Sequence, residues 1–272
     1  VSIEDKPDTK ANSVANGEVA FEHVSFAYPG AKENVLEDIS FVAKTGQTTA
    51  IIGGTGSGKT TLVNLIPRFF DVTKGKVMVD GTDIREMSQE SLREAIGYVP
   101  QKGVLFSGTI ASNLRYGKED ATKEQVMDAA RIAQAKEIID GKKDGLDSAI
   151  AQGGSNVSGG QKQRFSIARA IVKDPKIYIF DDSFSALDYK TDAILRRELS
   201  KKTKEAAVII VAQRISTILH AEQIIVLDEG KVAGIGTHQE LFDHCAVYRE
   251  IAESQLSEAD IAKLKAQGKE VM

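Results

Sequence analysis

The chain has 272 residues and a formal net charge of −4, with 42% hydrophobic and 27% charged residues. This composition is typical of a globular chain of one domain or two small ones, and the acidic balance argues against a nucleic-acid-binding protein. No apolar run approaches the roughly 18 residues that a membrane span requires. The single cysteine, Cys245, excludes an intrachain disulfide and fits a reducing compartment.

The N-terminal part of the sequence combines a polar segment with short strands. Residues 1–16 are polar and lack periodicity, which is typical of a linker. Apolar residues then predict strands over 19–28, 35–41 and 49–52. The third of these is an apolar run, which indicates a buried strand.

A glycine-rich turn follows this buried strand and matches the pattern G-x-x-x-x-G-K-[ST]. Glycines let backbone N–H groups approach a phosphate without a Cβ in the way, and the helix that follows, predicted to end near Phe70, adds unpaired donors. Lys59 can reach the β- and γ-phosphates, and the Thr60 hydroxyl can bind Mg²⁺. The sequence therefore predicts a nucleotide phosphate site formed by Gly53, Gly54, Thr55, Gly56, Ser57, Gly58, Lys59, Thr60 and Thr61.

The middle of the chain changes from mixed to helical signals. A strand is predicted over 76–81, and residues 91–99 are predicted to form a short helix followed by a strand. After these elements, strand signals nearly vanish. Apolar residues over 124–139 recur close to every 3.6 positions, and a second helix is predicted from just after Gly160 to about Val172. We interpret residues 109–172 as a helical insertion between two strands of the core.

Three more short apolar strands are predicted over 177–180, 208–212 and 224–227. Strands that alternate with helices and are apolar on both faces indicate a mostly parallel sheet covered by helices. Asp181 directly follows the first of these strands. Because ligands bind at the carboxyl ends of such strands, Asp181 is a candidate metal partner for the phosphate site.

A second glycine motif precedes the helix that ends near Val172. The run Asn156-Val157-Ser158-Gly159-Gly160-Gln161-Lys162-Gln163-Arg164 places a serine and two glycines at a helix start, where an anion can bind, although serine is also a favoured N-cap. With this motif the chain resembles the nucleotide-binding domain of ATP-binding-cassette (ABC) transporters, whose signature loop it matches. Gln101 matches the Q-loop of that family, Ser185-Ala186-Leu187-Asp188 its D-loop, and Tyr28 the aromatic residue that stacks on adenine.

The resemblance extends over about residues 17–251 and implies an α/β fold. We expect a P-loop NTPase core with a mixed, mostly parallel sheet, an N-terminal antiparallel β subdomain and the inserted α-helical subdomain at 109–172. The segments 100–110, 214–217 and 236–241 are similar to exporter domains fused behind six membrane helices. The resemblance thus identifies 1–16 as the linker from an absent transmembrane domain and 252–272 as a charged C-terminal tail.

The family resemblance also implies a mechanism. Two such domains form a head-to-tail dimer at the cytoplasmic face of the membrane and drive transport by closing on ATP. Each ATP lies between the phosphate loop of one domain and the signature loop of the other. In this chain the implied contacts to nucleotide from the second half of the sequence are Ser158, Gly159, Gly160, Gln161 and Asp188, and the implied Mg²⁺ ligands are Thr60, Gln101 and Asp181.

Two candidate catalytic positions depart from the family pattern. Asp182 stands where a glutamate orients or deprotonates the attacking water, and the shorter side chain withdraws the carboxylate by about 1 Å, which can cost on the order of 100-fold in rate. Gln213 stands in place of the switch histidine and cannot become cationic. A smaller departure is Gln152-Gly153-Gly154, where exporters usually show Glu-Arg-Gly. Gln101 completes the catalytic set.

The sequence is compatible with three functional hypotheses. The first is an ATPase subunit of a heterodimeric exporter, whose partner domain is a different chain with glutamate and histidine intact, so that hydrolysis at this chain's own site is weak. The second is a largely non-hydrolytic ATP-binding module that regulates or dimerises with its partner. The third, an ABC-type protein that acts on nucleic acid or ribosomes, is disfavoured by the acidic charge and the exporter-like Q-loop.

Overall fold

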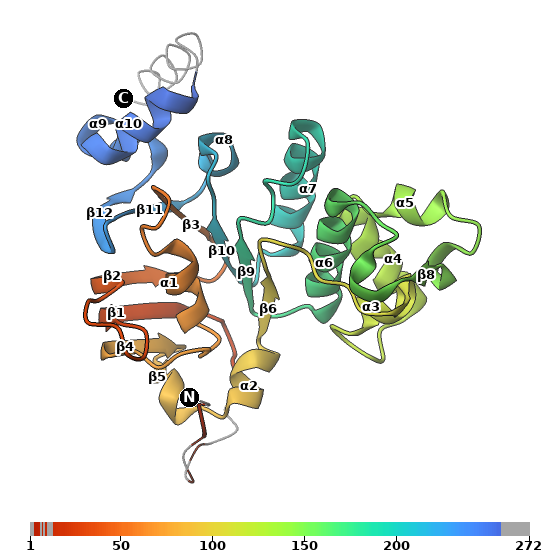
Figure 1. The fold of residues 1–272 in the computed structure, drawn as a ribbon, viewed down its shortest axis with the longest axis horizontal. Helices are drawn as coiled ribbons and strands as arrows, with labels where there is room; N and C mark the ends of the chain where they lie inside the picture. The colour runs from red at the N-terminus through yellow and green to blue at the C-terminus, as the bar shows by residue number, and fades with distance from the viewer. Residues whose placement is uncertain (1–2, 6, 8, 10–12, 257–272) are drawn as a thin grey trace.

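The computed structural model describes residues 3–5, 7, 9 and 13–256. A six-stranded sheet forms the centre of the fold, in the order β12-β11-β3-β10-β9-β6 (Figure 1). Five of its strands are parallel, and β12 pairs antiparallel with β11 at one edge. The strands are β3 (Thr48–Gly53), β6 (Ile96–Val99), β9 (Ile177–Asp181), β10 (Ala207–Val211), β11 (Gln223–Asp228) and β12 (Lys231–Gly236).

Alternate residues of the parallel strands enter two separate hydrophobic cores, one on each face of the sheet. Within β9, Tyr178 and Phe180 face one core, and Ile177 and Ile179 face the other. Strands buried on both faces are continuously apolar, which is why the sequence pattern predicts β9 and β10 correctly.

One face of the central sheet carries the phosphate-loop helix and a second sheet. That sheet is antiparallel in the order β2-β1-β4-β5, with β1 at Val19–Phe26, β2 at Leu36–Ala43, β4 at Lys74–Val79 and β5 at Thr82–Asp83. Helix α1 (Lys59–Leu65) lies between the two sheets and buries Leu62 and Leu65 in their shared core (Figure 1).

The other face is covered by helices, some of which extend away from the sheet as a separate helical lobe (Figure 1). This lobe contains α3 (Ile110–Arg115), α4 (Lys123–Ile132), α5 (Lys136–Asp140) and α6 (Gly159–Lys173). None of the helices in the described part of the chain has the length and apolar character needed to cross a bilayer.

The two sheets and the helical lobe together confirm the expected α/β class, with its antiparallel β subdomain and inserted helical subdomain.

Several predicted elements have different bounds in the structure. Helix α1 ends at Leu65 rather than near Phe70, because Pro67 cannot continue a helix and Arg68 adopts a left-handed conformation with φ 53°. The helix expected over 124–139 is broken between α4 and α5, where Gln134 has φ 56°. The predicted helical insertion also contains a two-stranded antiparallel sheet of β7 (Gly108–Thr109) and β8 (Ala149–Ile150), too short to give a sequence period.

The remaining helices follow the central strands. They are α2 (Gln89–Glu94) before β6, and α7 (Tyr189–Lys202), α8 (Ile215–Ile218), α9 (His238–His244) and α10 (Ala246–Gln255) in the C-terminal half. The boundary expected after Ile251 falls inside α10, whose Tyr248 and Ala252 are fully buried. The rest of the expected C-terminal tail, 257–272, lies outside the described residues.

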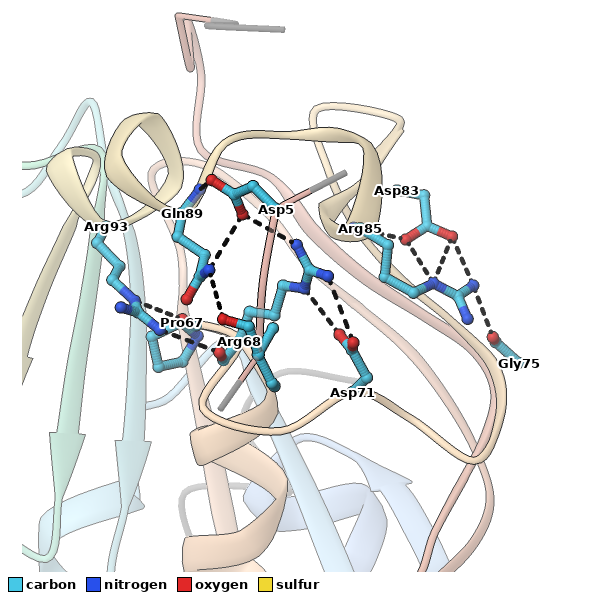
Figure 2. Close-up of polar contacts among 10 residues, drawn as sticks. Asp5, Pro67, Arg68, Asp71, Gly75, Asp83, Arg85, Gln89 and Arg93 are labelled. Atoms are coloured by element: carbon cyan, nitrogen blue, oxygen red, sulfur yellow. Dashed lines mark hydrogen bonds and ion pairs between the residues drawn. The ribbon is translucent and has the colours of Figure 1, made fainter. Parts of the chain in front are cut away.

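Asp5, near the N-terminus, contacts the turn after α1 and the start of α2 (Figure 2). The carbonyl oxygen of Ile3 also accepts a hydrogen bond from the Gln89 side chain. The Asp5 carboxylate accepts hydrogen bonds from the backbone N–H of Gln89 at 3.0 Å and from its side-chain amide at 3.1 Å. It also lies 3.4 Å from the guanidinium of Arg68, which pairs with Asp71 at 2.7 Å. Arg68 is a buried cation, with its side chain 3% exposed, so these carboxylates neutralise a charge that would otherwise destabilise the fold.

Candidate nucleotide-binding site

The loop between β3 and α1 has a backbone path that requires glycine. Gly56 and Gly58 have φ of 79° and 99°, in the left-handed region. A Cβ on Gly53 would overlap the carbonyl oxygen of Leu227, so the loop also packs tightly on β11. No side chain of the described residues caps the first turn of α1. Its backbone N–H groups are therefore available to an anionic ligand.

A cavity of about 560 Å³ opens over this loop, at the carboxyl ends of β3, β9 and β10. Ligands bind at this edge of open α/β sheets because the loops that follow parallel strands meet there. The cavity is lined by Val35, Ile52, Gly53, Gly54, Thr55, Gly56, Gly58, Lys59, Thr60, Thr61, Gln101, Asp181, Asp182, Val211, Gln213, Ile251, Ser254 and Gln255.

The Lys59 ammonium is held against the loop itself. It donates hydrogen bonds to the carbonyl oxygens of Gly53 and Gly54, at 2.9 and 2.7 Å. Burial lowers the pKa of Lys59, and the nearby carboxylates of Asp182 and Asp181 oppose that shift. The side chain thus places a partly desolvated donor at the base of the cavity, where phosphate oxygens would bind.

Thr60 and Asp181 meet across the cavity from different elements. The Thr60 hydroxyl donates to an Asp181 carboxylate oxygen at 3.1 Å, and the Tyr98 hydroxyl lies 3.4 Å from the other. Burial raises the pKa of Asp181, while these two hydrogen bonds lower it. No group of three or more His, Cys, Asp or Glu side chains that could hold a metal occurs in the described part of the chain. A hydroxyl beside a single carboxylate fits Mg²⁺, which takes its remaining ligands from phosphates and water.

Asp182 connects the three candidate catalytic residues. One of its carboxylate oxygens accepts from the side-chain amide of Gln213 at 2.8 Å and from that of Gln101 at 3.1 Å. Its backbone has φ 49°, a conformation that Asp tolerates better than most residues, and its N–H donates to Val211 in β10. Burial raises the pKa of Asp182, opposed by hydrogen bonds that include the one from Gln101. The carboxylate is therefore held by two neutral amides at the cavity wall.

Tyr28 lies beside the phosphate loop but does not line the cavity formed by the described residues. Its hydroxyl is 2.9 Å from the Thr61 hydroxyl, and its ring packs edge-on against Phe26 and Phe70. The residue is 36% exposed, which leaves surface of Tyr28 accessible at the loop. Ser57 of the loop is 5% exposed and does not line the cavity formed by the described residues.

The signature-loop and D-loop residues likewise lie away from this chain's own cavity, as judged from the described residues. Ser158 and Gln161 cap α6 reciprocally, each side chain accepting from the other's backbone N–H at 3.2 and 3.1 Å. Asp188 caps α7 through the N–H and hydroxyl of Thr191. Ser158, Gly159 and Asp188 are exposed, so the starts of α6 and α7 are open to a second molecule.

Several residues of the site were not identified from the sequence. The one sequence signal for Tyr98 was its position near the end of a predicted strand, three residues before Gln101. In the structure this strand is β6, which pairs with β9. Ser254 and Gln255 line the cavity from α10, although the sequence pattern placed them in a charged tail. No local motif marks these two, because their position depends on how α10 packs on the core.

Comparison with known proteins places the chain in a family. A sequence model described as ABC transporter matches residues 36–185. An uncharacterized ABC transporter ATP-binding protein of Mycobacterium bovis is 49% identical over 260 residues, which cover 94% of this chain and 44% of that protein. The ATP-dependent lipid A-core flippase of Legionella pneumophila is 42% identical over 88% of this chain and 40% of its own length.

A solved structure agrees with these sequences. The structure of a bacterial Atm1-family ABC exporter with ATP bound superposes with a TM-score of 0.91 at 36% identity, covering 95% of this chain and 45% of that one. The chain thus spans less than half the length of the relatives described above. By its sequence, its fold and its phosphate loop, it belongs to the ABC transporter family and is an ATP-binding domain homologous to those of exporters.

Proposed function

We propose that this chain is the ATP-binding and ATP-hydrolysing domain of a membrane exporter, in which ATP-driven closure of a domain dimer is coupled to transport. The observation that carries the proposal is the cavity in which the phosphate loop, Thr60 and Asp181 meet Asp182 and its two amide partners. Among its relatives, one is named a lipid A-core flippase and another an ABC exporter. The domain would accordingly lie at the cytoplasmic face of the membrane, beside a transmembrane domain.

ATP binding is assigned to the phosphate loop. The backbone N–H groups of the loop and of the first turn of α1 would receive the phosphates, and Lys59 would exchange its carbonyl partners for β- and γ-phosphate oxygens. Thr60, Asp181 and Gln101 would hold Mg²⁺, which supplies charge neutralisation at the phosphates. The exposed ring of Tyr28 would stack on adenine.

A second domain is needed to complete the site. Ser158, Gly159, Gly160, Gln161 and Asp188 are proposed to contact nucleotide, yet none of them lines the cavity formed by the described residues. The exposure of Ser158 and Gly159 at the start of α6, and of Asp188 at the start of α7, instead supports contact with the ATP of a partner domain. This arrangement is a head-to-tail dimer, in which each domain seals the other's nucleotide.

Hydrolysis at this chain's own cavity is proposed to be weak. The Asp182 carboxylate is one methylene shorter than glutamate and accepts two amide hydrogen bonds, so it is poorly placed to orient a water at the terminal phosphate. Gln213 can donate one hydrogen bond there but cannot supply a positive charge. We therefore infer that the partner domain is a different chain with an intact glutamate and histidine, and that the active hydrolytic site uses this chain's signature loop.

The same pair of amide contacts favours a second candidate function. An ATP-binding module that hydrolyses little could hold the dimer together and regulate its partner. Turnover of MgATP by the purified domain separates the two functions. Measurable turnover that is lost in the variant Lys59→Ala supports the ATPase. ATP binding that promotes association in analytical ultracentrifugation, with no turnover above that of Lys59→Ala, supports the module. Absence of ATP binding contradicts both.

A further inference from the structure

The last residue of helix α10, Gln255, bridges the two ends of the segment that follows β10. Its side-chain amide nitrogen donates to the carbonyl oxygen of Gln213 at 2.8 Å. Its side-chain oxygen accepts from the backbone N–H of Ile215 at 2.9 Å. A carbonyl on one side and an N–H on the other need a group that donates and accepts at once, which a primary amide does.

Helix α10 is a firm support for this bridge. Its residues Tyr248 and Ala252 are fully buried in the core, and the Tyr248 hydroxyl is hydrogen-bonded to His238 of α9 at 2.7 Å. On the other side of the bridge, Ile215 and Ile218 of α8 are also buried. Gln255 is itself exposed, but its two hydrogen bonds connect these packed elements and restrain the backbone of residues 213–215.

The side chain of Gln213 reaches the catalytic wall from this restrained backbone. Its amide nitrogen donates to Asp182 at 2.8 Å, and both Gln213 and Gln255 line the cavity over the phosphate loop. A shift of the Gln213 backbone by 1 Å would move that amide out of hydrogen-bonding range of its partners. Gln255 therefore holds the backbone position from which the Gln213 side chain extends.

We propose that Gln255 is a positioning residue, which holds Gln213 so that its amide contacts the terminal phosphate of bound ATP. The inference rests on the proposed function, in which the triphosphate occupies this cavity. Because ADP lacks the terminal phosphate, loss of the bridge weakens ATP binding and leaves ADP binding unchanged. The expected loss for Gln255→Ala is about tenfold in ATP affinity, on the scale of one hydrogen bond to a charged group.

Calorimetric titration of the whole chain with MgATP and MgADP tests this inference. The variants are Gln255→Ala, Gln213→Ala and the double variant, together with Gln255→Glu, which keeps the acceptor for Ile215 and loses the donor to Gln213. Glu253→Ala, an exposed position on the same helix, is the matched control. Thermal unfolding of each variant shows whether α10 remains folded.

Gln255→Ala is expected to bind ATP about as weakly as Gln213→Ala, and the double variant no more weakly than either, because both changes remove one interaction. Gln255→Glu is expected to behave like Gln255→Ala, and Glu253→Ala like the unmodified chain. Equal losses of ATP and ADP affinity, fully additive effects, or unchanged ATP binding in Gln255→Ala would each overturn the inference. Lys59→Ala distinguishes failure of this inference from failure of the proposed function, because unchanged ATP binding in that variant contradicts the proposed function itself.

Discussion

Lengthening Asp182 by one methylene is predicted to restore hydrolysis. In the structure its carboxylate oxygen is 2.8 Å from the Gln213 amide and 3.1 Å from the Gln101 amide, at the wall of the cavity. Asp182→Glu moves the carboxylate about 1 Å towards the place of the terminal phosphate, and an error of this size in placing a catalytic group costs on the order of 100-fold. We therefore expect turnover to rise by up to about 100-fold, equivalent to about 2.7 kcal/mol in the barrier.

A second substitution, at Gln213, is predicted to add positive charge to the catalytic wall. Gln213→His adds a side chain that can become cationic near the terminal phosphate, so the double variant Asp182→Glu, Gln213→His is expected to be faster than Asp182→Glu alone. The assay is release of inorganic phosphate at saturating MgATP. Asp182→Asn keeps the size of the side chain without its charge and is expected to remain slow. Lys59→Ala reports contaminating ATPase activity.

One result would refute this account of the catalytic wall. If the double variant binds MgATP normally but hydrolyses it no faster than the unmodified chain, the defect does not lie at Asp182 and Gln213. A rise in Asp182→Asn equal to that in Asp182→Glu would also refute it, because the argument depends on a carboxylate in the extended position.

Three further predictions concern stability and metal binding. Burial raises the pKa of Asp181 above that of the unfolded chain, so the folded chain binds more protons between the two values and stability falls as pH rises through that window. Asp181→Asn should therefore raise the melting temperature at pH 7.5, with a gain that shrinks as the pH falls towards 4. Thr60→Val should abolish the Mg²⁺-dependent part of the thermal shift caused by ATP and leave the Mg²⁺-independent part. In urea unfolding, Asp71→Asn should cost about 1–3 kcal/mol because it removes the negative charge that pairs with buried Arg68 at 2.7 Å, whereas Asp5→Asn, whose carboxylate is 3.4 Å from the same guanidinium, should cost about 1 kcal/mol or less.

The parts of the fold with strong local signals were predictable. The buried strand β9 is apolar at every position before Asp181, and the phosphate loop has a backbone that only its glycines allow. In contrast, helix α7 gave no prediction. Its buried residues Leu195 and Leu199 are few, and its exposed face is highly charged. Its position is determined by packing over the sheet rather than by its own periodicity.

Some residues of the candidate site could likewise be predicted from local sequence, and others could not. Asp181, the last residue of β9, and Asp182, directly after it, can be placed at the carboxyl edge from sequence because the strand ends there. Gln255 lies 42 positions after Gln213 and reaches it only because α10 packs back onto the core. Contacts of that kind follow from tertiary packing, which local patterns do not encode.

Titration of the chain with MgATP, compared with the same titration of Lys59→Ala, tests the central claim most directly. The exposed Lys143→Ala, in the helical lobe, is the matched control for loss of a positive charge. Because the Lys59 ammonium would bind two phosphate groups, we expect ATP affinity to fall by about 100-fold or more in Lys59→Ala and to remain unchanged in Lys143→Ala. Equal ATP affinity in the unmodified chain and in Lys59→Ala would show that the nucleotide does not bind at this loop.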